Sequence, residues 1–172
     1  MKDKVFSPVG MLVIGGLMGA LAKLSDVYFR VSYFRTSLSE VTSQMSVWIV
    51  IGVAISLFSG SRKKAMVNVF LFCAGMLAAY YVTAELTGAV YGWTFIKGWA
   101  VFACFSPVMA YLVTLTKGRG VLPLLIKLCV LAVYAGVDLL LFGGPQIWDV
   151  LLLLPLLYLL FAKSTPTDFL KK

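Results

Sequence analysis

The stretch Val121–Phe142, with the sequence VLPLLIKLCVLAVYAGVDLLLF, decides the fold class of this chain. Its residues are apolar almost throughout, and only Lys127 and Asp138 carry a charge. A helix needs about 20 mostly apolar residues to cross the ~30 Å hydrocarbon layer of a membrane, and this stretch is long enough. A membrane-barrel strand would instead show about ten residues of alternating polarity. The stretch therefore predicts a transmembrane helix.

Apolar runs of the same kind extend outward from this stretch toward both ends of the chain. Short polar or glycine-containing segments separate them, and they cover residues 9–29, 45–58, 65–86, 93–115, 121–142 and 147–162. Each run is unbroken rather than alternating, which favours helices over barrel strands. We therefore predict an all-α, polytopic integral membrane protein. Its residues 1–172 would form a single domain, a bundle of about six transmembrane helices.

The composition of the whole chain supports this prediction. Hydrophobic residues make up 61% of the 172 residues and charged residues only 13%, with a mean hydropathy of +0.97. A soluble domain has roughly 45–50% apolar and about 25% charged residues. Six membrane helices would use ~120 residues and leave only short loops, so we expect no separate soluble domain.

The net charge of +8 first suggests nucleic acid as a partner, but the basic residues form short clusters between apolar runs. Such clusters orient membrane proteins, because cytoplasmic loops are enriched in Lys and Arg. With the N-terminus inside, ten of these residues lie on the inner side and three on the outer side. The inner set is Lys2, Lys4, Arg62, Lys63, Lys64, Lys117, Arg119, Lys163, Lys171 and Lys172, and the outer set is Arg30, Arg35 and Lys97. We therefore expect a multi-pass protein of the cytoplasmic (plasma) membrane, with both termini cytoplasmic and no nucleic-acid partner.

Catalytic and metal-binding motifs are missing from the sequence. The chain has no histidine, and its three cysteines lie within apolar runs, where they resemble small apolar side chains. There is no nucleophile elbow, zinc-protease motif, P-loop or dinucleotide fingerprint. Asp138 follows Ala-Gly-Val rather than the Gly-x-Gly of intramembrane aspartyl proteases. We expect no enzyme, no cofactor and no metal site.

Charged residues within the apolar runs are the best candidates for function. A charge at membrane depth costs about 2.5–3.5 kcal/mol on insertion scales, so such residues usually face the protein interior or water. In the first run, Gly16, Gly19, Lys23 and Asp26 recur at helical spacing and form one stripe. In the alternative interpretation, Lys23 and Asp26 form a simple ion pair while Glu85 and Lys97 reach the membrane surface.

We predict that these charges line an outward-facing cavity, together with two tyrosines. Both signs of charge would suit a small cationic or zwitterionic solute, and aromatic rings would add cation–π contacts. The predicted substrate-binding residues are Lys23, Asp26, Tyr81, Glu85, Lys97, Tyr134 and Asp138.

Small residues in the first run form a second signal. Gly15, Gly16, Gly19 and Ala20 give two pairs of small residues, each spaced by four positions. Such pairs let a neighbouring backbone approach closely in a membrane, where packing drives helix association. They predict either close packing inside the bundle or a docking face for a partner membrane subunit.

In its architecture the chain resembles the S components, the membrane-embedded substrate-binding subunits of energy-coupling-factor vitamin transporters. Those proteins have six helices, both ends inside and an outward-facing pocket, and a small-xxx-small motif in helix 1 docks onto the coupling subunit. Gly15/Gly19 and Gly16/Ala20 match that spacing, although the family motif is normally built on alanine. The resemblance implies a solute-binding subunit of a multi-component importer, with a membrane coupling subunit as its partner.

Two other classes of function stay open from the sequence. The chain could be a small secondary transporter or channel, self-associated, that uses Asp26, Glu85 or Asp138 as proton or cation sites. It could also be a non-transporting membrane partner, such as an immunity or assembly factor. In all three classes the lipid bilayer is a partner.

Overall fold

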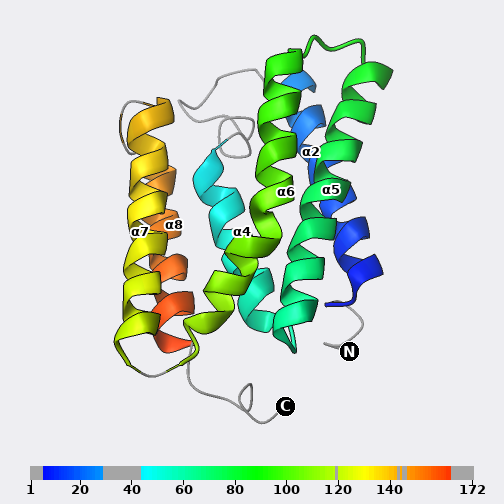
Figure 1. Cartoon of the computed structure of the whole chain (residues 1–172). Helices are drawn as coiled ribbons and strands as arrows, with labels where there is room; N and C mark the ends of the chain where they lie inside the picture. The colour runs from blue at the N-terminus through cyan, green and yellow to red at the C-terminus, as the bar shows by residue number, and fades with distance from the viewer. Residues whose placement is uncertain (1–5, 29–43, 119, 143, 145–146, 164–172) are drawn as a thin grey trace. The chain divides into compact units, whose positions relative to one another are not determined.

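Six α-helices and one π-helical segment make up the part of the chain that the computed structural model describes (Figure 1). That part comprises residues 6–28, 44–118, 120–142, 144 and 147–163. None of these residues forms a strand, which confirms the all-α class and the six predicted helices. The elements are α2 (Pro8–Tyr28), α4 (Met45–Phe58), α5 (Arg62–Leu86), α6 (Trp93–Leu115), α7 (Val121–Phe142), α8 (Ile147–Leu157) and η1 (Tyr158–Ala162).

Three of the described helices are long and apolar enough to cross a membrane. They are Pro8–Tyr28, Arg62–Leu86 and the Ile96–Leu115 portion of α6. The apolar helical segments Met45–Phe58, Val121–Val137 and Ile147–Ala162 are shorter. Three apolar helices of this length are consistent with a membrane protein, and six membrane crossings stay a prediction.

The helices belong to two compact units. The first unit contains Met1–Ser43 and Met66–Pro107, and the second contains Gln44–Ala65 and Val108–Lys172. Both α5 and α6 cross the division, so each unit receives a part of them. That the whole chain forms a single transmembrane domain stays a prediction.

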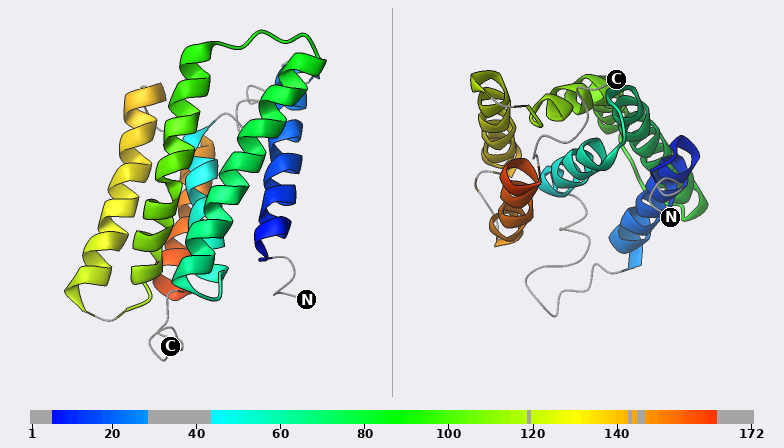
Figure 2. Two further views of the ribbon diagram at one scale, coloured as in Figure 1. Left: turned by 45° about the vertical axis from the view of Figure 1, so that its right-hand side comes forward. Right: turned by 90° about the horizontal axis from the view of Figure 1, so that it is seen from below.

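In the first unit, α2 and α5 run parallel to each other in close contact (Figure 2). A Cβ atom added to Gly15 would lie 2.1 Å from the Phe72 carbonyl oxygen, and one added to Gly19 would lie 2.1 Å from that of Met76. On the other side of the contact, a Cβ on Gly75 would lie 2.4 Å from the Leu12 carbonyl oxygen. Only glycine fits at such distances. We call Gly15, Gly19 and Gly75 the glycine seam.

Polar contacts fix the start of α2. Ser7 accepts a hydrogen bond from the Gly10 N–H at 3.1 Å, and Pro8 occupies the first helical position, where its missing N–H is harmless. The buried Asn68 of α5 donates its side-chain N–H to the Phe6 carbonyl at 2.9 Å. These bonds hold the beginning of α2 against α5.

In the second unit, α4 packs against both α7 and α8 (Figure 1). Their contact encloses an apolar core formed by Val53, Leu57, Val113, Tyr134, Leu156, Leu159 and Leu160. The predicted sixth run is divided here into α8 and η1. Pro155 has no N–H to donate within α8. α8 ends two residues later at Leu157, and the chain continues as the π-helical segment η1.

Candidate functional site

The glycine seam leads directly to Lys23. Gly15 lies against Phe72, Gly19 against Met76, and four residues further along each helix Lys23 lies against Tyr80. The Lys23 ammonium is 4.9 Å from the centroid of the Tyr80 ring, which is within cation–π range. The parallel course of α2 and α5 therefore sets this contact.

Lys23 is only 6% exposed, although it carries a charge. Among the described residues it forms no ion pair and no hydrogen bond, and the ring of Tyr80 is the group that its ammonium contacts. A buried charge is costly unless it is paired, because the surrounding medium solvates it poorly. The Lys23 ammonium is therefore suited to receive an anionic group.

Asp26 lies one turn after Lys23 and is half-buried. The Tyr80 hydroxyl donates a hydrogen bond of 2.7 Å to Asp26 Oδ2. The simple ion pair between Lys23 and Asp26, which was the alternative interpretation of the sequence, is not formed. Tyr80 instead contacts both residues, the ammonium through its ring and the carboxylate through its hydroxyl.

Two more tyrosines continue from Tyr80. The rings of Tyr80 and Tyr81 are edge to face with centroids 5.3 Å apart, and those of Tyr81 and Tyr91 are edge to face at 5.4 Å. The Tyr91 hydroxyl donates a hydrogen bond to Glu85 Oε1. We call Tyr80, Tyr81 and Tyr91 the tyrosine cluster. It connects a carboxylate of α2 with one of α5 at the end of the first unit.

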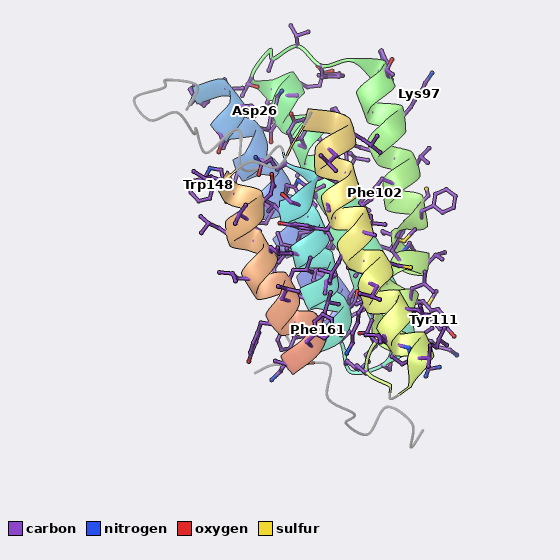
Figure 3. The ribbon with its side chains drawn as sticks, turned by 90° about the vertical axis from the view of Figure 1, so that its left-hand side faces the viewer. Asp26, Lys97, Phe102, Tyr111, Trp148 and Phe161 are labelled. Carbon is purple, nitrogen blue, oxygen red and sulfur yellow. The ribbon has the colours of Figure 1, made fainter. Side chains whose placement is uncertain are left out.

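The remaining predicted site residues differ in exposure, and apart from Glu85 their described side chains do not contact the tyrosine cluster. Glu85 is exposed, and Lys97 is exposed near the start of α6, where Figure 3 shows it pointing away from the ribbon. Tyr134 is buried in α7 of the second unit. The backbone of Asp138 is also in α7, but its side chain lies outside the described part of the structure. A single cavity lined by all seven residues stays a prediction.

The four small residues of α2 differ in their surroundings. Gly15 and Gly19 are covered by α5, as described above. Gly16 has more room, because a Cβ added there would lie 3.9 Å from the nearest atom, Ala79 Cβ, and Ala20 is half-buried. Docking of a partner subunit on these residues stays a prediction.

Sequence reasoning missed a buried polar cluster in the second unit. The Ser46 hydroxyl donates to Asp149 Oδ1 at 2.6 Å, and the Tyr134 hydroxyl donates to the Asp149 main-chain carbonyl at 2.7 Å. All three side chains are less than 5% exposed. The cluster ties together α4, α7 and the first turn of α8. Its signal in the sequence is Asp149, an acidic residue inside the sixth apolar run.

Metal binding finds no support in the described residues, where no group of acidic, cysteine or histidine side chains could hold an ion. No family model, characterised protein or solved structure matches this chain. The candidate site therefore consists of Lys23, Asp26 and the tyrosine cluster, identified by their chemistry alone.

Proposed function

We propose that this chain is a multi-pass protein of the cytoplasmic membrane that binds a small zwitterionic or cationic solute for transport. The site would be Lys23, Asp26 and the tyrosine cluster. A carboxylate of the solute would pair with the Lys23 ammonium, and its cationic group would lie near Asp26 and the tyrosine rings. The resemblance to the S components extends this proposal to the solute-binding subunit of a multi-component importer.

The observation that carries the proposal is the buried Lys23 ammonium, which has no ion-pair partner in the described residues. A buried cation held only by an aromatic ring is costly in a protein that merely needs to fold. An anionic group of a solute would relieve that cost. Asp26, one turn away, supplies the opposite charge.

Binding is tested with the purified protein in detergent and a panel of amino acids, betaines, polyamines and dicarboxylates. We expect zwitterions and then cations to raise the thermal unfolding temperature, and dicarboxylates to have no effect. Replacing Lys23 with Gln should weaken zwitterion binding by at least about tenfold, because a hydrogen bond to a charged group contributes about 1.5–3 kcal/mol. Asp26→Asn should weaken the binding of cations.

Lys63→Gln is the matched control, since Lys63 is exposed at the other end of α5. It removes the same charge and should leave binding unchanged. A protein that is stabilised equally by dicarboxylates and zwitterions would contradict the proposed site. Extraction of the protein from membranes by alkaline carbonate would contradict its insertion in the bilayer.

A further inference from the structure

One end of the second unit carries positive charge only, as far as its described residues show. This is the end at which α4, α6 and η1 finish and at which α5 and α7 begin. The basic residues of these helix ends are Arg62, Lys63, Lys64, Lys117, Lys127 and Lys163. Asp149 is in the first turn of α8, at the opposite end of that helix. Asp138 lies about 16 Å further along α7 than Lys127, given a rise of 1.5 Å per residue.

Lys127 occupies an unusual position within this set. It lies in the second turn of α7 rather than in a loop, and it is half-buried. Its ammonium is 5.1 Å from the centroid of the Phe161 ring of η1. In the described part of the structure no carboxylate pairs with it.

Lys163, two residues after Phe161, forms the same kind of contact with another ring. Its ammonium is 5.7 Å from the centroid of the Phe58 ring, at the last residue of α4. Phe161 is therefore in contact with Lys127, and two residues later Lys163 is in contact with Phe58. The two rings remain 47% and 43% exposed, so an apolar surface adjoins both ammonium groups. Figure 3 shows Phe161 in η1, close to the end of the helical stretch that α8 and η1 form, with Trp148 near the start of α8.

From this arrangement we propose a binding site for an anionic phospholipid at Lys127, Lys163, Phe58 and Phe161. The lipid phosphate would pair with the two lysines, and its acyl chains would lie along the two exposed rings. A zwitterionic lipid fits less well, because its own cationic group would approach a surface that already carries several positive charges. The proposal depends on the membrane insertion proposed above, but not on solute binding.

The chemistry of a headgroup favours this occupant over a soluble anion. Juxtamembrane Lys and Arg residues bind anionic lipids, and basic pockets between helices on the cytoplasmic side bind acidic headgroups. The aromatic rings add a reason for a lipid, since a free phosphate would gain nothing from them. Long basic side chains can also extend along apolar surface to place their charge at the membrane boundary.

Native mass spectrometry of the full chain in detergent tests the proposal with added phosphatidylglycerol and, separately, phosphatidylcholine. We expect phosphatidylglycerol to be retained in preference. Each lysine near a membrane surface contributes about fivefold, so Lys127→Gln with Lys163→Gln should reduce retention roughly 25-fold. Replacing both lysines with Arg should preserve retention.

The matched control is Lys63→Gln with Lys64→Gln, which removes two exposed charges from the same end that contact no ring in the described structure. It should reduce retention by no more than about fivefold, because in detergent these two lysines would contribute only to the general positive charge of this end and would not pair with the bound phosphate. Equal retention of the two lipids, or equal loss in control and test variants, would overturn the proposal. So would displacement of the lipid by millimolar glycerol phosphate, which would indicate a site for soluble anions.

A photoactivatable phosphatidylglycerol keeps the test independent of the variants. Cross-links of the wild-type chain should fall on Phe58, on the first two turns of α7 and on η1. Cross-links spread evenly over all helices would contradict a specific site. If alkaline carbonate extracts the protein, the membrane insertion falls and the lipid site falls with it. If the protein resists carbonate but cross-links evenly over all helices, only the lipid site falls.

Discussion

Single glycine residues set how closely α2 approaches α5. The carbonyl oxygens of Phe72 and Met76 lie where side chains at Gly15 and Gly19 would begin. The two backbones thereby come close enough for weak Cα–H···O contacts, which recur at interfaces between helices. The same approach places Tyr80 against Lys23 and Asp26. Packing at the glycine seam and geometry at the site are thus linked.

Separate alanine substitutions at Gly19 and Gly16, which lie one helical turn apart in α2, distinguish the effect of close helix packing from that of helix propensity. Gly19→Ala places a Cβ 2.1 Å from the Met76 oxygen, so the helices must separate, and we expect a loss of about 1–3 kcal/mol in the free energy of unfolding. Gly16→Ala meets its nearest atom at an ordinary 3.9 Å and should stabilise by up to about 0.5–1 kcal/mol. Denaturant unfolding in detergent measures both. Equal effects of the two substitutions would mean that the contact at Gly19 is not as close as described.

At the level of residues, the sequence predicted charges better than their partners. Lys23 and Asp26 were found because a charge inside an apolar run is costly. Tyr80 was missed and Tyr81 chosen, because which of two adjacent tyrosines faces α2 depends on the register between the helices. That register follows from the contacts of Gly15 and Gly19 with backbone atoms of α5, which no pattern in one helix can give.

The bounds of the helices were predicted closely, because unbroken apolar runs of this length favour helices over strands. The largest difference is at α5, which begins at Arg62 rather than at residue 65. The Ser61 hydroxyl accepts a hydrogen bond from the Lys64 N–H at 3.2 Å and caps the helix, so three basic residues join its first turn. Caps of this kind depend on local polar residues, which a search for apolar runs passes over.

A lysine closes the end of another helix. The Lys117 ammonium donates a hydrogen bond of 2.6 Å to the Leu57 carbonyl in the last turn of α4. The last carbonyls of a helix have no helical donor, and a basic side chain can satisfy one of them. Lys117 is 9% exposed, and its burial lowers its pKa from 10.5 to about 8.

This lowered pKa predicts how stability depends on pH. Between pH 8 and 10.5 the unfolded chain still holds the Lys117 proton while the folded chain has released it. The free energy of unfolding should therefore rise with pH across this window and stay level, for this group, below it. Thermal unfolding in detergent should show a smaller rise for Lys117→Met than for the wild type. The exposed Lys64→Met is the control, and identical pH profiles of wild type and Lys117→Met would contradict the prediction.

At the scale of the whole molecule, the basic residues of the sequence predict how the chain is oriented in the membrane. The structure shows at which helix ends those residues lie. In the second unit, the end that carries Arg62–Lys64, Lys117 and Lys163 is the end at which α4 and η1 finish. Asp149 lies in the first turn of α8 at the other end, where it is buried and accepts hydrogen bonds from Ser46 and Tyr134. A buried carboxylate there gives no signal in a count of basic loops. Charge counting therefore predicts topology, while the hydrogen-bond partners of Asp149 follow only from how the helices pack.

Labelling of single cysteines in intact cells tests the predicted orientation. In a chain whose Cys73, Cys104 and Cys129 are replaced by serine, new cysteines would be placed at Ser61, Gly118 and Ser37. The first two adjoin basic clusters, which favour the cytoplasmic side. A membrane-impermeant maleimide should therefore miss Ser61→Cys and Gly118→Cys and label Ser37→Cys.

The same reagent after cell lysis should reach all three positions, which controls for burial of the thiol. Retention of Lys-rich segments on the inside follows from the cost of moving several positive charges across the bilayer together. An intermediate pattern is informative as well, because each position reports on its own loop. If Gly118→Cys is labelled from outside, α6 and α7 must be inserted in the opposite direction or not at all. If they are inserted in the opposite direction, the phospholipid site at Lys127 and Lys163 faces the outer leaflet, and the cytoplasmic assignment of both termini is wrong.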